Sequence, residues 1–116
     1  MRVKEVYEKL GEDYQLAISR LSKEERIEKY FLLFLKDGSF AELEKGFADG
    51  DMFVAFRAAH TLKGVCANLC LNTLSSYASI LTEDLRNGAN ITHAKDCFPR
   101  FREEYLKVID AITSSQ

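Results

Sequence analysis

The sequence has few of the residues that interrupt regular secondary structure. It holds one proline, Pro99, six glycines and no tryptophan among 116 residues. Because proline and glycine mark turns and breaks, their scarcity leaves room for long regular elements. β-branched residues do not gather into alternating runs, so strand signals are nearly absent. The chain is therefore predicted to be all-α.

The sequence also lacks a long apolar run and a strong charge of either sign. Its longest apolar run, Tyr30 to Leu35, is too short to cross a bilayer, and residues 1–10 mix charged and apolar side chains, unlike a signal peptide. The net charge of −2, with no cluster of basic residues, argues against nucleic acid as a partner. We expect a cytoplasmic protein that binds neither membrane nor nucleic acid.

The usual signatures of metal and nucleotide sites are missing as well. Cys66 and Cys70 stand four apart, and the Cys-x-x-Cys spacing of zinc and redox sites is absent. The Glu-x-x-His pattern of di-metal bundles is broken three residues before both His60 and His93. No Gly-rich phosphate loop is present. We expect reduced thiols, no metal, no cofactor, no ATP-dependent kinase activity, and a surface position for His93.

Capping and breaking residues predict where the helices begin and end. Ser22 with Glu25, and Ser39 with Glu42, fit capping boxes, so helices should begin just after Ser22 and Ser39. Further caps and breaks are predicted along the chain at Asp37-Gly38, Asp49-Gly50, Asp51, Asn72, Arg86-Asn87-Gly88 and Thr92. Pro99 falls in the second turn of the last helix, which therefore either starts later or bends there.

The predicted helices fit one domain spanning residues 1–116, because no linker, repeat or low-complexity tract divides the chain. Short connections favour antiparallel neighbours, which predicts an up-and-down four-helix bundle over residues 22–113. Two short amphipathic pieces within residues 1–21, separated by Gly11, are expected to pack on it as a lid. We expect the protein to be a monomer.

The helix predicted from Asp51 to about Leu69 has two unlike faces. One face carries small and aliphatic residues that suit a core, namely Ala55, Ala58, Ala59, Leu62, Val65, Cys66 and Leu69. His60 lies on the opposite face and should be exposed to solvent. Its neighbours there are Phe53, Phe56 and Arg57 before it, and Lys63, Gly64 and Ala67 after it.

Gly64 and Lys63 are the informative neighbours of His60. Glycine inside a helix costs about 1 kcal/mol of stability relative to alanine, so Gly64 needs a reason. It could leave room for a group that approaches the imidazole, or it could allow a close contact with another helix. The Lys63 ammonium could neutralise a phosphoryl group on the imidazole, or simply face solvent. We expect the lid to cover Phe53 and Phe56, the alternative being that they form an exposed contact surface.

The segment Ala59-His60-Thr61-Leu62-Lys63-Gly64, continued by residues 65–69, resembles the A-H-x-L-K-G signature of histidine-containing phosphotransfer (Hpt) domains. A looser resemblance extends from Asp51 through Leu81 to Gly88. The resemblance implies a four-helix bundle and a phosphohistidine intermediate in multistep two-component signalling. Receiver domains of response regulators, including that of a hybrid sensor kinase, are the partners it implies, with Mg²⁺ bound in the receiver.

By this resemblance His60 is the phosphoacceptor, Lys63 stabilises the phosphoryl group and Gly64 provides clearance. The sequence departs from the family at two places. Cys70 stands where a glycine often ends the histidine helix, so Leu71-Asn72 is expected to make the turn. Thr82 is expected opposite His60, where some members carry glutamine, and it could hold the imidazole or face solvent.

Docking of a receiver is expected on the exposed surface around His60. The expected apolar contacts are Phe56, Ala67 and Leu71, with Arg57, Lys63 and Arg86 at the edge. A different class of function stays open at this point: a helical adaptor that uses the same surface and is never phosphorylated.

Overall fold

The computed structural model describes residues 1–116 and is helical throughout. Seven α-helices and one 3₁₀ turn follow one another along the chain: α1 (Val3–Leu10), α2 (Tyr14–Leu21), α3 (Glu24–Lys36), α4 (Ser39–Asp49), α5 (Met52–Asn68), α6 (Asn72–Leu85), η1 (Arg86–Gly88) and α7 (Ile91–Thr113). The all-α prediction is confirmed. No helix has the length and apolarity that crossing a bilayer requires.

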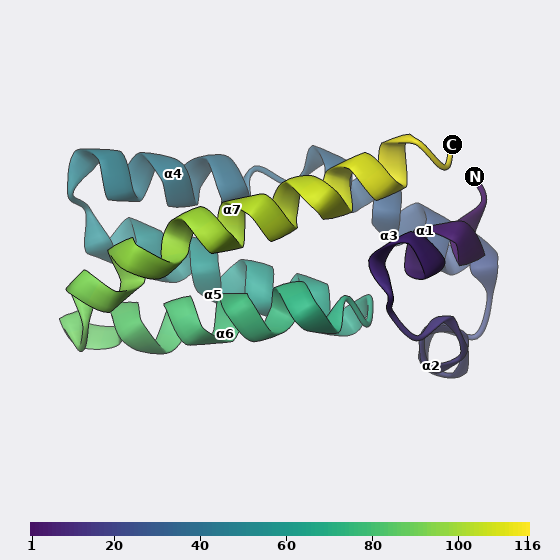
Figure 1. Cartoon of the computed structure of the whole chain (residues 1–116), viewed down its shortest axis with the longest axis horizontal. Helices are drawn as coiled ribbons and strands as arrows, with labels where there is room; N and C mark the ends of the chain where they lie inside the picture. Colours follow the sequence, from purple (N-terminus) through teal and green to yellow (C-terminus); the bar gives the residue numbers. More distant parts are fainter.

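Helices α4, α5, α6 and α7 form a four-helix bundle along the 39 Å long axis of the molecule (Figure 1). Successive helices run in alternate directions, which is the up-and-down arrangement expected from their short connections. Aromatic rings join α4 to α7: Phe40 stacks on Tyr105 with ring centroids 4.0 Å apart, and Phe47 stacks on Phe98 at 4.7 Å. The predicted up-and-down four-helix bundle is confirmed, but it covers residues 39–113 rather than 22–113, because α3 packs with α1 and α2.

The remaining helices, α1 to α3, gather at one end of the bundle beside the C-terminus (Figure 1). The Tyr7 hydroxyl of α1 donates a hydrogen bond to the carbonyl oxygen of Leu69 at 2.8 Å, tying the lid to the end of α5. The backbone N–H of Arg2 donates to the carbonyl oxygen of Ser115, also at 2.8 Å. Since α3 contacts both α1 and α2, the N-terminal layer has three helices where the sequence predicted two.

A single hydrophobic cluster of 26 buried residues runs through the molecule, and every α-helix contributes to it. Small residues bring α4 and α5 close together within this cluster. A Cβ atom on Gly46 of α4 would lie 2.7 Å from the backbone nitrogen of Ala55 on α5. Gly46 is therefore the glycine that a close helix contact requires.

Helices α3 and α4 begin close to the residues that the sequence predicted, but different residues lie at their N-caps. Neither capping box forms. Ser22 ends α2 with φ of 74°, and Lys23 occupies the N-cap position of α3 without a side-chain bond. At the start of α4 the Asp37 side chain replaces Ser39 as the cap. Its Oδ1 accepts a hydrogen bond from the N–H of Ser39 at 2.7 Å.

Of the later helices, α5 has the predicted cap and α7 does not. Asp51 caps α5 as predicted, accepting a hydrogen bond from the N–H of Val54 at 3.1 Å. Asn90, rather than Thr92, caps α7 by accepting from the N–H of His93. The last helix therefore begins earlier than predicted and continues through Pro99.

The turn between α5 and α6 is made by Cys70, whose φ of 57° is left-handed. The N–H of Leu71 donates to the carbonyl oxygen of Cys66 at 2.9 Å, which closes the turn behind Cys70. The prediction that Leu71-Asn72 would make the turn is wrong. Leu71 lies before the first residue of α6, and Asn72 is already helical.

Candidate functional site

Helix α5 presents His60 to solvent at the middle of the bundle. Ala59 and Leu62, on either side of His60, are at most 1% exposed. Their burial fixes the rotation of α5 about its axis, because residues on opposite faces of a helix cannot both be buried in one core. His60 is accordingly exposed, as its position in the sequence predicted.

An aromatic ring and a guanidinium group lie on the N-terminal side of His60. The Phe56 ring, one turn before His60 on α5, has its centroid 6.0 Å from the imidazole centroid with the planes tilted by 47°. The Arg86 guanidinium lies over the same Phe56 ring, 5.0 Å from its centroid. A cation over an aromatic face is attractive, so Arg86 links η1 to the histidine helix.

Glu83 adds a carboxylate that the sequence analysis did not assign to the site. Arg86 Nε and Nη2 donate hydrogen bonds to the two Glu83 carboxylate oxygens, both at 3.3 Å. The pKa of Glu83 is lowered mainly by this hydrogen bond and the Arg86 charge, with smaller contributions from Lys63 and His60. The three-residue spacing of Glu83, on the last turn of α6, and Arg86, at the start of η1, was the signal available in the sequence.

Lys63 and Gly64 lie one turn after His60. Lys63 is half-buried and takes part in none of the ion pairs of the structure. A Cβ atom on Gly64 would meet nothing within 4 Å, so Gly64 makes no close helix contact. The space beside His60 is therefore open at Gly64, and the interpretation of this glycine as clearance is the one that fits.

Two of the residues assigned to the site by sequence are buried instead. Thr82 is 0% exposed, and its Oγ1 donates a hydrogen bond to the carbonyl oxygen of Ala78 at 2.7 Å. Ser75 Oγ donates to the carbonyl oxygen of Lys63, which places residue 78 level with His60 and Thr82 about one turn further along α6. Thr82 therefore does not hold the imidazole.

Leu71 is the second buried residue, with 0% of its surface exposed. It was expected as an apolar docking contact, but the left-handed turn at Cys70 directs the chain back into the core before α6 begins. Leu71 therefore offers no surface to a partner.

Phe53 and Phe56 are not covered by the lid, contrary to expectation. Phe53 is 65% exposed, and the Arg57 guanidinium lies 5.7 Å from its ring centroid. The lid is tied to the other end of α5 through Tyr7 and Leu69. A hollow of about 270 Å³ lies beside Phe53, Phe56 and Arg86.

The part of the chain that forms the bundle also matches a known family. The model of the Hpt domain family matches residues 37–112, from the turn before α4 almost to the end of α7. The chain belongs to the Hpt domain family. No curated protein and no solved structure matches it. Hpt domains are phosphocarrier modules of two-component and phosphorelay signalling that work with receiver domains and kinases.

A groove lies beside the histidine face of this Hpt domain, between α3 and the last turns of α5. Its volume is about 550 Å³, and it is lined mostly by apolar side chains: Leu21, Tyr30, Leu33, Phe34, Val65, Ala67 and Leu69, with Arg20, Asp37 and Asn68. Ala67 is half-buried and lies two turns after His60 on the same helix. The groove therefore continues the surface around His60 toward α3, which precedes the residues that match the family.

Proposed function

We propose that His60 accepts a phosphoryl group from the aspartyl phosphate of a receiver domain and passes it to the aspartate of another receiver. The observation that carries this proposal is the exposed His60 imidazole within the Hpt match, beside the unpaired Lys63 ammonium and the open space at Gly64. Phosphoryl transfer needs an accessible nucleophile and nearby positive charge, and this face supplies both.

In the transfer step an unprotonated His60 nitrogen attacks the phosphorus atom. The N–P bond forms as the P–O bond to the receiver's aspartate breaks, and negative charge is spread over the three remaining phosphoryl oxygens. Lys63 neutralises part of that charge, together with the Mg²⁺ that we expect in the receiver.

The surroundings of His60 prepare it for attack. Phe56 contacts the imidazole on one side, and Arg86 holds Phe56 from the η1 turn. These contacts restrict the side chains next to the nucleophile before a partner arrives, which lowers the ordering cost of docking. The chain offers a nucleophile and a surface, and the receiver contributes the metal and the phosphorylated aspartate.

We assign docking of the receiver to two apolar areas that flank His60. One is formed by Phe53 and Phe56 with Arg57 and Arg86 at its edge, and the other is the groove that begins at Ala67. Exposed aromatic and aliphatic groups rimmed by arginine are typical of the centre and rim of protein interfaces.

A transfer assay tests the proposal. Phosphorylated receiver domains are mixed with the wild-type chain and with Lys63→Met, and phosphate on the chain is followed over time. Lys63→Met should slow transfer about tenfold, equivalent to about 1.4 kcal/mol of charge stabilisation, without unfolding the bundle. Lys95→Met, which removes an exposed lysine of α7, is the matched control and should transfer at the wild-type rate.

Two results would change the assignment. Equal rates for Lys63→Met and the wild type would remove Lys63 from the transfer step. A receiver that binds the chain but never passes phosphate to it, and that binds a His60→Gln variant equally well, would establish the non-phosphorylated adaptor instead.

A further inference from the structure

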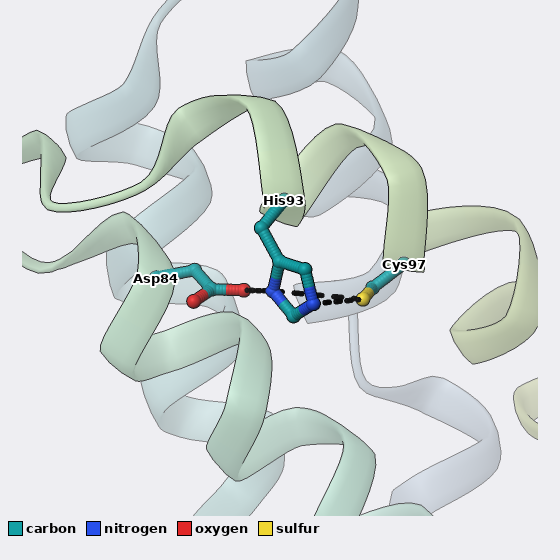
Figure 2. Close-up of side chains that lie close together, drawn as sticks. All are labelled: Asp84, His93 and Cys97. Carbon is teal, nitrogen blue, oxygen red and sulfur yellow. Dashed lines mark hydrogen bonds and ion pairs between the residues drawn. The ribbon is translucent and has the colours of Figure 1, made fainter.

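Three side chains with metal-binding atoms converge at the corner between α6 and α7 (Figure 2). Asp84 comes from the last turn of α6, and His93 and Cys97 come from the first two turns of α7. Asp84 Oδ2 lies 2.5 Å from His93 Nδ1, and Cys97 Sγ lies 3.4 Å from His93 Nε2. One atom from each of the three residues lies within 4.8 Å of the others.

The corner that carries this cluster is fixed by hydrogen bonds of its own. The backbone N–H of Asn90 donates to the carbonyl oxygen of Asp84 at 2.8 Å. The Asn90 side chain accepts from the N–H of His93 at 3.1 Å and so sets the first turn of α7. His93 and Cys97, four residues apart, share one face of that helix. The backbone therefore brings the three residues to one corner of the fold without a ligand.

We propose that Asp84, His93 and Cys97 form a binding site for a Zn²⁺ ion. Thiolate, imidazole and carboxylate are the three ligand types that Zn²⁺ takes from proteins, and three protein ligands leave a fourth position for water. The mixture of sulfur, nitrogen and oxygen disfavours Mg²⁺ and Ca²⁺, which prefer oxygen ligands alone.

The three residues are within reach of one ion, but their side chains are not yet arranged around it, because Asp84 contacts Nδ1 of His93 and Cys97 lies nearer Nε2. In a tetrahedral site, Zn–S of about 2.3 Å and Zn–N of about 2.0 Å separate sulfur from nitrogen by roughly 3.6 Å. Cys97 Sγ lies 3.4 Å from Nε2 and 3.8 Å from Nδ1 of His93. The carboxylate sits closer to the ring than in a zinc site, where oxygen and nitrogen ligands are roughly 3.3 Å apart. An ion bound to Nδ1 would therefore move Asp84 away from His93 by about 0.8 Å and would require the Cys97 side chain to turn from Nε2 toward the ion.

Metal binding replaces protons in this cluster. The Cys97 thiol gives its proton to solvent and binds as thiolate. The proton shared by Asp84 and His93 moves to Nε2 or to solvent, so that Nδ1 and the carboxylate each contribute a lone pair. Exposure suits such an exchange: 51% of the His93 side chain is open to solvent, which gives the ion a path of entry, while only 16% of the Asp84 side chain is.

The same three residues could be taken for a cysteine nucleophile with its histidine base, but the surroundings disagree. The carboxylates of Asp84 and the neighbouring Asp96 place negative charge near Cys97, where a thiolate nucleophile needs positive charge. Cys97 also lies inside α7, where backbone N–H groups are occupied by helix hydrogen bonds and cannot stabilise an oxyanion. A cation, in contrast, is favoured by both carboxylates.

Cobalt provides the direct test, because Co²⁺ occupies zinc sites and a cobalt–thiolate bond gives a charge-transfer band in the near ultraviolet. The reduced full-length chain is titrated with Co²⁺, and the bound metal is then displaced with Zn²⁺. One equivalent of Co²⁺ with the thiolate band, lost on addition of Zn²⁺, is the expected result. Zinc affinity is measured separately by competition with a chromophoric chelator.

Variants assign the ligands. Cys97→Ser should abolish the cobalt band, and His93→Gln and Asp84→Asn should each weaken zinc binding at least tenfold, with helical circular dichroism showing that each variant is folded. His60→Gln, which changes the only other histidine, should bind like the wild type. Absence of metal uptake by the wild type, or a band that persists in Cys97→Ser, would overturn the proposal. It stands apart from the role proposed for His60.

Discussion

At the scale of single residues, two glycines with similar sequence surroundings have opposite roles. Gly46 of α4 is required by packing, because a Cβ there would lie 2.7 Å from backbone atoms of α5. Gly64 of α5 faces open space, so packing does not explain it. A residue that costs helix stability without improving packing is expected to serve another molecule, and here the neighbouring side chain is His60.

Replacing Gly64 separates stability from function. Gly64→Ala should raise the free energy of unfolding by about 1 kcal/mol, since alanine favours the helix and meets no neighbour. The same variant should accept phosphate from a receiver more slowly, because the added methyl occupies the clearance beside His60. Urea unfolding and the transfer rate measure the two effects.

Gly46→Ala is the matched control for that substitution. It should lower the free energy of unfolding by about 1–3 kcal/mol through overpacking against Ala55. Faster or unchanged transfer in Gly64→Ala would show that clearance is not the reason for this glycine.

Cys66 gives the fold a predictable response to alkaline pH. Burial, and to a smaller extent the charge of Asp37, raises the pKa of the Cys66 thiol from 9.0 to about 12. The unfolded chain therefore loses this proton first, and stability that is fully present below pH 9 falls as pH rises toward 12. The Cys66 contribution alone should fall by about 1.4 kcal/mol between pH 8 and pH 10.

Urea unfolding of the wild type and of Cys66→Ala at both pH values isolates this contribution. The variant should be less stable at pH 8, because its core has lost a buried group, but its stability should decline less between the two pH values. Parallel declines would mean that other groups carry the alkaline sensitivity.

Sequence reasoning placed correctly the residues whose position depends on one helix alone, and it misplaced or missed those whose position depends on a neighbouring helix. His60, Lys63 and Gly64 follow from the period of α5 and the Hpt signature. Thr82 was misplaced because its position relative to His60 depends on how α5 and α6 are aligned, which the Ser75–Lys63 hydrogen bond sets. Glu83 was missed since its partner Arg86 was assigned only to docking.

At the scale of the helices, boundaries were predicted within a few residues while most caps were not. Asp37 and Asn90 take the capping roles expected of Ser39 and Thr92. Several polar residues stand near each helix start, and the one that caps is decided by the path of the incoming turn rather than by residue type.

The turn between α2 and α3 stores strain at Ser22. Its φ of 74° and ψ of −39°, with the N–H of Lys23 donating to the carbonyl oxygen of Leu21 at 2.9 Å, describe a tight three-residue turn that L-residues disfavour. Ser22→Gly should therefore raise the free energy of unfolding by about 1 kcal/mol.

Thermal unfolding is a sufficient measurement for this turn, because Ser22 is exposed and its side chain makes no hydrogen bond. Ser19→Gly, an exposed change inside α2, is the control and should lower stability instead. A Ser22→Gly variant that melts below the wild type would show that the turn is not strained.

At the scale of the whole molecule, the position of the lid was beyond the reach of sequence patterns. The lid was expected over Phe53 and Phe56, at the start of α5, but the Tyr7–Leu69 hydrogen bond ties it to the end of α5. The two residues of that bond are 62 positions apart in the chain, and amphipathic periodicity shows which face a helix buries without showing against which partner.

This position predicts that the lid stabilises the bundle without taking part in transfer. Tyr7→Phe leaves the buried Leu69 carbonyl without its hydroxyl partner and should lower the free energy of unfolding by about 1–3 kcal/mol. Its phosphotransfer rate should equal that of the wild type under conditions where both are folded. A slower rate with an intact fold would place the lid in the docking surface.

The phosphorylated side chain itself gives the most direct test of the whole account. The chain is phosphorylated by a receiver domain, and the site is located by peptide mapping under alkaline conditions, where phosphohistidine survives. Phosphate on His60 in the wild type and in His93→Gln, with none on His60→Gln, is the predicted result. Phosphate on His93, on a hydroxyl or cysteine residue, or on His60→Gln to the same extent would contradict the assignment of His60 as the phosphoacceptor.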